Sequence, residues 1–244
     1  MTCYRIDLAY DGSEFHGYAR QPNVRTVQGE LEKALFKLVG EVETTVAGRT
    51  DRGVHARAQV VSFEADAGLD TDLISRSLNR QLAPEIAVSR VAVAAEGFSA
   101  RFSAIGRAYT YLVLNRSVPD PFLARTSWFY KTPLDLDLMN QGVAHLVGKH
   151  DFAAFCRRAP NRSTERRLDS ALWTDLDRGL LAFDVGASSF CHQMVRSLVA
   201  LSVEIGRGRV APDQVPAILA SRDRHQSKGA APAHGLTLVA VTYD

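Results

Sequence analysis

A single aspartate, Asp51, lies between two arginines in a short segment bounded by glycines. The segment, residues 48–60, reads Gly-Arg-Thr-Asp-Arg-Gly-Val-His-Ala-Arg-Ala-Gln-Val. The guanidinium groups of Arg49 and Arg52 favour the ionised form of the carboxylate between them. A carboxylate kept ionised in this way could act as a nucleophile or as an electrostatic anchor for a ligand.

The residues around Asp51 predict a tight loop between two strands. Gly48 and Gly53 allow backbone angles that other residues avoid, and they let a ligand approach closely. Apolar, β-prone stretches at 42–47 and 60–63 flank the loop. A surface turn whose neighbouring charges neutralise one another would share the pattern Arg-x-Asp-Arg, so this pattern alone fits both a turn and a site.

Length and composition indicate a globular protein outside the membrane. The chain has 244 residues, enough for one large domain or two smaller ones, and is 46% apolar and 23% charged. No run approaches the roughly 18 apolar residues that a membrane helix needs. Residues 1–7 lack the apolar stretch of a signal peptide. We therefore expect a cytoplasmic location.

Cysteines and glycines point to no cofactor. Cys3, Cys156 and Cys191 are odd in number and far apart, and no Cys/His spacing suits zinc. We expect free thiols at all three positions and no metal site. Neither a Walker loop nor a G-x-G-x-x-G motif occurs, so no nucleotide cofactor is expected.

Arginine dominates the basic residues. The formal net charge is only +2, but lysine supplies 5 of the 29 basic residues and arginine the other 24. A GC-rich genome would produce the same bias. Five arginines gather in one stretch with a single acid, Glu165: Arg157, Arg158, Arg162, Arg166 and Arg167. The stretch is either a solvated charged loop or an arm that follows phosphates.

Hydrophobic periodicity predicts the order β-α-β-β-α-β twice. In the first half we expect strands at 4–10, 42–47, 58–64 and 86–94, with helices at 27–39 and 71–82. In the second half we expect strands at 104–115, 168–175, 180–186 and 236–243, with helices at 135–147, 190–206 and 212–220. The pattern indicates two α+β domains, 1–104 and 105–244, each an antiparallel sheet with helices on one face. A groove between two such sheets would suit an elongated polyanion.

Motifs spread over the whole chain resemble the bacterial tRNA pseudouridine synthase A family. Besides the Asp51 loop they are residues 9–18, 26–28, 101–111, 150–155, 194–196 and 232–243, in the family's order. Three positions depart from the family pattern. Tyr18-Ala19 replaces a tryptophan-glutamine pair, Ser99 replaces a histidine, and His192-Gln193 shifts another histidine by one place.

The resemblance implies a pseudouridine synthase fold with ferredoxin-like halves and a central catalytic cleft. It further implies isomerisation of uridine at positions 38, 39 and 40 in the anticodon stem-loop of tRNA, with Asp51 as the catalytic nucleophile. Whether Asp51 attacks C1′, attacks C6 or acts as a base stays open. The reaction gains no atoms, so it needs neither a redox cofactor nor ATP.

The resemblance also assigns roles to residues of the second half. Tyr109 would stack on the target base, and Arg196 would pair with Asp51, for which Arg49 is the alternative partner. Substrate contacts are expected from Arg49, Arg107, Tyr109, Tyr111, Arg157, Arg158 and Arg162. Tyr109 could instead be a sheet tyrosine that packs under a helix, a role for which Tyr111 is the better candidate. Family members form homodimers, and apolar residues on several faces of 190–206 would suit a partner chain.

Two other function classes share some of these features. A tRNA-binding module without catalysis would carry the same arginines. An aspartate-nucleophile phosphohydrolase would explain Asp7 and Asp11-Gly12 after an apolar strand. That chemistry generally needs two carboxylates two residues apart together with magnesium, whereas the spacing here is four.

Overall fold

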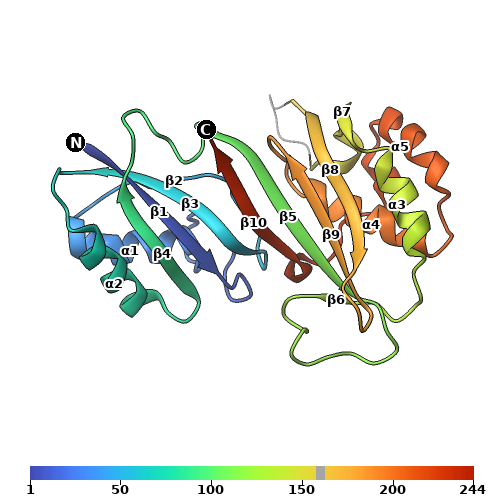
Figure 1. The fold of residues 1–244 in the computed structure, drawn as a ribbon, viewed down its shortest axis with the longest axis horizontal. Coiled ribbons are helices and arrows are strands. Elements are labelled where there is room, and N and C mark those ends of the chain that lie inside the picture. Colours follow the sequence, from blue (N-terminus) through green and yellow to red (C-terminus); the bar gives the residue numbers. More distant parts are fainter. Residues whose placement is uncertain (158–162) are drawn as a thin grey trace. The chain divides into compact units, whose positions relative to one another are not determined.

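The chain divides into two units, each with strands and helices of its own (Figure 1). The first unit comprises Met1–Ile105 together with Thr237–Asp244, and the second comprises Gly106–Leu236. This is a computed structural model, and it describes residues 1–157 and 163–244. The α+β class expected from the sequence is confirmed.

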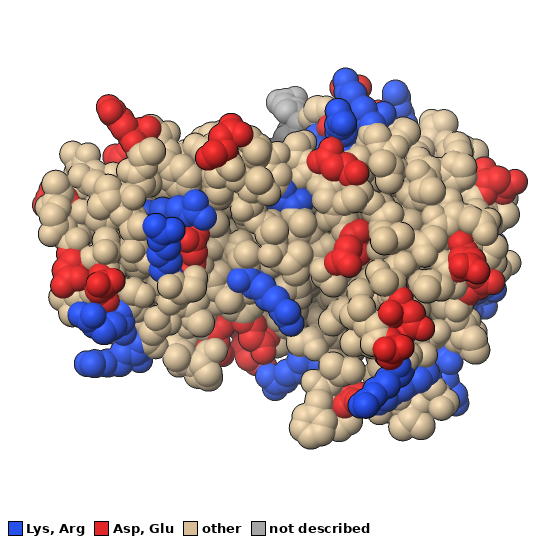
Figure 2. Space-filling model, in the orientation of Figure 1, with Lys and Arg blue, Asp and Glu red and all other residues tan. Residues whose placement is uncertain are grey.

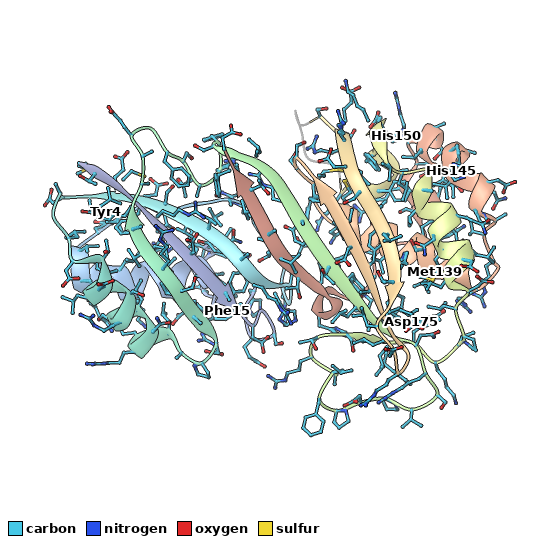
Figure 3. The ribbon with its side chains drawn as sticks, viewed as in Figure 1. Tyr4, Phe15, Met139, His145, His150 and Asp175 are labelled. Atoms are coloured by element: carbon cyan, nitrogen blue, oxygen red, sulfur yellow. A yellow bond between two sulfur atoms is a disulfide. The ribbon has the colours of Figure 1, made fainter. Side chains whose placement is uncertain are left out.

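The sheet of the first unit is built around β1 (Thr2–Tyr10). Its alternate residues Tyr4, Ile6, Leu8 and Tyr10 are buried, and they define the face toward the core. The strand order is β4-β1-β3-β10, with β2 beside β3; the bounds are β2 Thr45–Val46, β3 His55–Ala65, β4 Ile86–Val93 and β10 Leu236–Tyr243. Tyr4, labelled in Figure 3, stacks on Phe63 of β3 with ring centroids 5.4 Å apart.

Two capped helices pack together on this sheet, α1 (Val27–Val39) and α2 (Thr71–Leu82). Thr26 accepts the backbone N–H of Gly29 at the start of α1, and Asp70 caps α2 in the same way. Both helices have the expected bounds. On α2, Ile74, Leu78 and Leu82 are buried, whereas Leu73 is 54% exposed.

The last strand belongs to the first unit, although the sequence pattern placed it in the second half. β10 runs parallel to β3, with Thr237 opposite His55. Tyr243 packs against Phe98 in a cluster with Ala47, Val60, Ala100 and Val241, on the face of β3 opposite Val61 and Phe63. Its hydroxyl also donates to the carbonyl of Ala100 at 2.7 Å. These contacts bury apolar side chains within the first unit.

The sheet of the second unit has the order β5-β9-β8-β7, with β6 beside β5. Its strands are β5 Ala104–Leu114, β6 Trp128–Phe129, β7 Gly148–Asp151, β8 Glu165–Asp175 and β9 Leu180–Ala187. Tyr109, Tyr111 and Val113 share the buried face of β5, as expected. The sequence pattern missed β6 and β7, because two and four residues are too few to show a period of two.

One correction concerns the arginine-rich stretch. β8 begins at Glu165, so Arg166 and Arg167 lie in a strand rather than in a loop, opposite His150 and Lys149 of β7. Arg158 and Arg162 lie outside the described residues.

The helices of the second unit are α3 (Leu136–Ala144), α4 (Met194–Gly206) and α5 (Val215–Ser221). All residues of α4 are buried except Arg196 and Glu204. α3 packs closely on it: a Cβ on Gly206 would lie 2.7 Å from the Sδ of Met139, which Figure 3 labels on α3. The apolar residues of α4 are therefore covered within the chain, so they give no support for a partner chain.

Two further helix boundaries differ from expectation. α4 begins four residues later than expected, because Gln193 before it has a positive φ of 63°. α3 ends at Ala144, and Val147 beyond it is exposed. Among the described residues, no helix is both long and apolar enough to cross a membrane.

Candidate active-site loop

Asp51 lies in the loop that joins β2 to β3, in the first unit. Its side chain is partly buried, while Arg49 and Arg52 on either side are exposed. The Asp51 carbonyl accepts the backbone N–H of Val54 at 3.1 Å, which closes the loop into a turn. β3 begins at His55 rather than at residue 58, so the loop is shorter than expected. A short closed loop restricts where the carboxylate can lie.

A chain of buried hydrogen bonds ties the loop to the sheet. Gln59, which is fully buried, donates through Nε2 to the carbonyl of Gly48 at 2.8 Å and to the hydroxyl of Tyr10 at 3.2 Å. The Tyr10 hydroxyl in turn shares a hydrogen bond of 2.8 Å with Oγ1 of Thr50. Burial raises the pKa of Tyr10 to about 12, although hydrogen bonds from Thr50 and Gln59 oppose the rise. Tyr10 therefore stays neutral, and its hydroxyl stays a hydrogen-bonding group at every physiological pH.

Two glycines bring the segment after β1 against the loop. Gly17 has a φ of +94°, and a Cβ there would lie 2.9 Å from the carbonyl oxygen of Thr50. The next residue, Tyr18, donates its backbone N–H to that same oxygen at 3.1 Å. At Gly12 a Cβ would collide with the carbonyl of Val54. Since backbone atoms cannot move aside as a side chain can, glycine is required at both positions.

His55 joins the same arrangement from the start of β3. Its ring is buried, and Nδ1 accepts the backbone N–H of Gly12 at 3.1 Å. Residues 10–18, the family's opening motif, thus hold the Asp51 loop by backbone and side-chain contacts. The sequence pattern alone indicates no role for Tyr10, His55 or Gln59. The sequence offered one signal for such a role: the polar residues His55 and Gln59 interrupt a segment that is otherwise typical of an apolar strand.

The second unit carries the other expected site residues. Tyr109 on β5 is 8% exposed, and its ring meets Phe190 edge-on with centroids 5.2 Å apart. Two residues earlier, Arg107 donates through Nη1 to the carbonyl of Ser188 at 2.8 Å. Tyr111 is fully buried, and its hydroxyl donates to the carbonyl of Pro232 at 2.8 Å. Burial raises the pKa of Tyr111, with the charge of Arg196 acting in the opposite direction.

Arg196 is a partly buried residue near the start of α4. Its Nε donates to the carbonyl of Ala231 at 2.7 Å, and the Ala231 N–H donates back to the Arg196 carbonyl at 2.9 Å. The structure thus brings Arg196 near Tyr111, within the second unit. Asp51 and Arg49 belong to the first unit, so the pairing of Asp51 with Arg196 stays a prediction.

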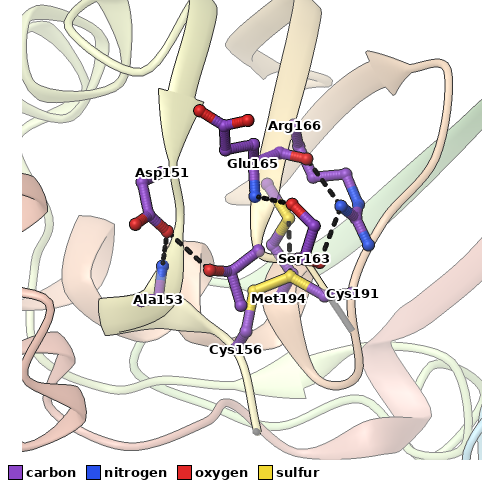
Figure 4. The surroundings of a disulfide bond; sticks show 9 residues. Asp151, Ala153, Cys156, Ser163, Glu165, Arg166, Cys191 and Met194 are labelled. Carbon is purple, nitrogen blue, oxygen red and sulfur yellow. Dashed lines mark hydrogen bonds between the residues drawn. A yellow bond between two sulfur atoms is a disulfide. The ribbon is translucent and has the colours of Figure 1, made fainter. Parts of the chain in front are cut away.

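The expectation of three free thiols was wrong for two of them. Cys156 and Cys191 form a disulfide, with Cα atoms 5.6 Å apart (Figure 4). The 35 residues between them in the sequence concealed the pairing, because only the fold brings η1 (Ala153–Phe155) beside the start of α4. Cys3 is the free cysteine of the described chain.

Basic and acidic side chains are mixed on the face that Figure 2 shows, rather than gathered in one patch. This agrees with the small net charge of +2. On this face, therefore, a polyanion would meet local groups of arginines rather than a uniform positive surface.

We predict that Gly17→Ala loosens the Asp51 loop, because the new Cβ would push against the Thr50 carbonyl. Gly68→Ala is the matched control: its φ of +85° is similar, but a Cβ there would meet nothing within 4 Å. Both variants should lose about 1–2 kcal/mol from the positive φ. Hydrogen exchange measured by mass spectrometry should rise at residues 48–54 in the Gly17 variant alone. Equal exchange of this segment in both variants would contradict the anchoring role of Gly17.

Comparison with known proteins supports one family over nearly the whole chain. A family model described as tRNA pseudouridine synthase matches residues 8–103 and 143–244. The tRNA pseudouridine synthase A of Moorella thermoacetica is 43% identical over the full length of both chains. That of Leifsonia xyli is 40% identical over 99% of this chain and 92% of its own length, and that of Fervidobacterium nodosum is 39% identical over all of both.

Among solved structures, a chain of the archaeal box H/ACA sRNP Nop10-Cbf5 complex aligns with 82% of this chain and 44% of its own, with 14% identity and a TM-score of 0.33. The assignment rests on the far closer sequence relatives. This chain belongs to the tRNA pseudouridine synthase family, the isomerases that act on uridine in tRNA.

Proposed function

We propose that the protein converts uridine to pseudouridine at positions 38, 39 and 40 in the anticodon stem-loop of tRNA, with Asp51 as the catalytic nucleophile. The observation that carries the proposal is the anchoring of the Asp51 loop by Gln59, Tyr10 and Gly17. A partly accessible carboxylate on a loop that is anchored in this way suits a reaction that needs one well-placed nucleophile. The choice of the anticodon stem-loop rests on the motif resemblance.

The reaction breaks the N1–C1′ bond, turns the uracil and joins C5 to C1′. Atoms balance without a second substrate, since the proton lost from C5 is matched by one gained at N1. The target base must leave its stack, which costs a few kcal/mol that contacts in the pocket restore. Asp51 attacks C1′ or C6, or removes a proton in an elimination route, and each alternative uses the same carboxylate.

Tyr109 is the proposed partner of the target base. An aromatic ring contributes about 1–3 kcal/mol per stacked base. Phe190 meets the Tyr109 ring edge-on, which would hold the ring in place without covering both of its faces. The Tyr109 hydroxyl is the proposed acceptor of the C5 proton. Tyr111 acts behind it as a support, since its own hydroxyl is bound to Pro232.

Arginines are the proposed contacts to the tRNA backbone. Arg49 is exposed beside Asp51, and Arg157 is exposed where the described chain breaks off. Arg107 belongs to the same set, as do Arg158 and Arg162 outside the described residues. Arg196 is proposed to orient the Asp51 carboxylate. A bidentate guanidinium–phosphate contact suits each of the backbone positions.

We further propose that the protein acts as a homodimer in the cytoplasm, where its tRNA substrate is found. The motif resemblance supports the pairing, since family members present the catalytic aspartate of one subunit to a tRNA held by the other. Two copies would also double the small positive charge of +2 per chain.

Asp51→Asn should lower the rate of tritium release from C5-labelled uridine in tRNA by about 10³-fold or more, because the amide cannot act as nucleophile or base. Phosphate contacts dominate tRNA affinity, so binding should stay within about tenfold. Asp66→Asn, an exposed position in the same unit, is the control and should release tritium normally. Near-normal release by the Asp51 variant would refute the proposed role.

Tyr109→Phe separates stacking from proton transfer. The variant keeps the aromatic face and removes only the hydroxyl, so tRNA binding should hold while product formation falls at least about tenfold. Tyr109→Leu should weaken binding as well, because it removes the stacking face. If Tyr109→Phe forms product at the normal rate and only Tyr109→Leu forms less, the hydroxyl has no part in the chemistry.

Light scattering at micromolar protein should give twice 26.7 kDa, the mass expected of a dimer. The expectation would be excluded by a single 26.7 kDa species that shows full tritium release at the same concentration.

A further inference from the structure

A basic pocket of about 690 Å³ lies within the second unit, and its Arg224 is close enough to Arg196 for their charges to interact. Its lining includes Arg157, Gln193, Arg222, Asp223, Arg224 and His225. Three arginines and one carboxylate thus line the pocket, and a second carboxylate, that of Asp151, lies beside Arg222. These residues come from three places: the end of η1, the start of α4, and the turn between α5 and η3 (Arg224–Ser227).

Arg224 is the most enclosed of the three arginines. Its Nη2 donates to Oε1 of Gln193 at 2.5 Å. Its Nη1 is shielded from solvent and has no hydrogen-bond partner among the described residues. Burial lowers the pKa of Arg224, and the charges of Arg157 and Arg196 lower it further. A shielded guanidinium donor beside other cations is unfavourable until an anion supplies an acceptor.

The backbone is strained at two residues that line this pocket. Gln193 has a φ of 63° and Arg222 a φ of 53°, in the left-handed region where glycine or asparagine is usual. Strain of this kind persists where the surrounding structure or a ligand makes use of it. At Arg222, the left-handed residue ends α5 and turns the chain toward Arg224.

Neighbouring groups hold the other two arginines in place. Nε of Arg222 lies 3.0 Å from Oδ2 of Asp151. The other oxygen of Asp151 accepts from the Ala153 N–H and the Thr164 hydroxyl, so this carboxylate is itself fixed (Figure 4). Arg157 donates its backbone N–H to the carbonyl of His192 at 2.9 Å. The Cys156–Cys191 disulfide ties the same two segments together.

Asp223 offsets only part of this charge. Its Oδ1 accepts the backbone N–H of His225 at 3.0 Å, so the carboxylate serves as the cap of η3. The pocket keeps an excess of positive charge and a set of forked N–H donors from different segments. Forked donors of this kind match the oxygens of a phosphate group.

We propose that this pocket binds a phosphate group, and that its ligand is a backbone phosphate of the tRNA substrate. The second half of this statement rests on the proposed function, whereas the first does not. Asp151 and the disulfide position the arginines, and Gln193 orients Arg224. This assigns a structural role to the histidine-aspartate-phenylalanine motif at 150–152, because its aspartate, Asp151, forms an ion pair with Arg222.

Arg222→Gly tests the proposal, with Arg178→Gly as a matched control. Arg178 also has a positive φ, of 54°, and it lies in the second unit outside the pocket. Each change removes one charge and relieves one left-handed residue. The Arg222 variant also loses its ion pair with Asp151, but the Arg222 side chain is 66% exposed, so this loss costs little and the two Tm values should be close. Affinity for fluorescent unmodified tRNA should fall about tenfold in the Arg222 variant alone. The slope of log K against log salt should decrease by about 0.7–0.9.

A second measurement identifies the source of the phosphate. At constant ionic strength, inorganic phosphate in place of chloride should raise the Tm of the wild type and of Arg178→Gly, but not of Arg222→Gly. Loss of this response together with the change in salt slope supports the tRNA phosphate. Loss of the response with an unchanged slope would overturn the tRNA assignment in favour of a small phosphorylated ligand. If the Arg222 variant keeps both the rise in Tm with phosphate and the salt slope of the wild type, the pocket does not bind phosphate and the proposal is wrong. Absence of tritium release by the wild type would refute only the proposed reaction, since inorganic phosphate tests the pocket without tRNA.

Discussion

The buried hydrogen bonds from Gln59 through Tyr10 to Thr50 are the constraint on which the Asp51 loop depends. A buried polar group without a partner costs about 1–3 kcal/mol. Burying these three side chains is therefore favourable only when all of their hydrogen bonds form. Apolar packing alone would tolerate small shifts of the loop. The hydrogen bonds do not, because each needs its donor and acceptor at about 3 Å. The network thus specifies one position for the loop that carries the carboxylate.

The same principle accounts for the glycines of the opening motif. Gly12 and Gly17 lie so close to the loop backbone that any side chain would displace it. Their role is to let two backbone segments touch, and Tyr18 uses that closeness to donate to Thr50. Residues far apart in the sequence therefore act together on Asp51. A substitution at 12 or 17 would disturb the carboxylate without contacting it.

Local signals predicted the elements of this fold well, and tertiary contacts explain the errors. Thr26 and Asp70 are side-chain caps, so the starts of α1 and α2 could be predicted from the sequence alone. The pairing of Cys156 with Cys191, the parallel contact of β10 with β3, and the short strand β7 all depend on partners distant in the sequence. Asp51 could be identified as a candidate site residue because the arginines that flank it, Arg49 and Arg52, are its neighbours in the sequence. Arg222 and Arg224 escaped notice because their pocket exists only after folding.

The choice of arginine over lysine follows from the small net charge. At physiological salt, exposed charges act over about 8 Å, so a chain with a net charge of only +2 attracts a polyanion weakly from a distance. Affinity must then come from short contacts, in which a forked and weakly hydrated guanidinium surpasses an ammonium group. Such contacts need fixed geometry. Asp151 and Gln193, which hold Arg222 and Arg224, supply that geometry at the cost of left-handed backbone at two positions. A protein with a large positive surface could bind RNA through mobile lysines, whereas this protein must place its arginines individually.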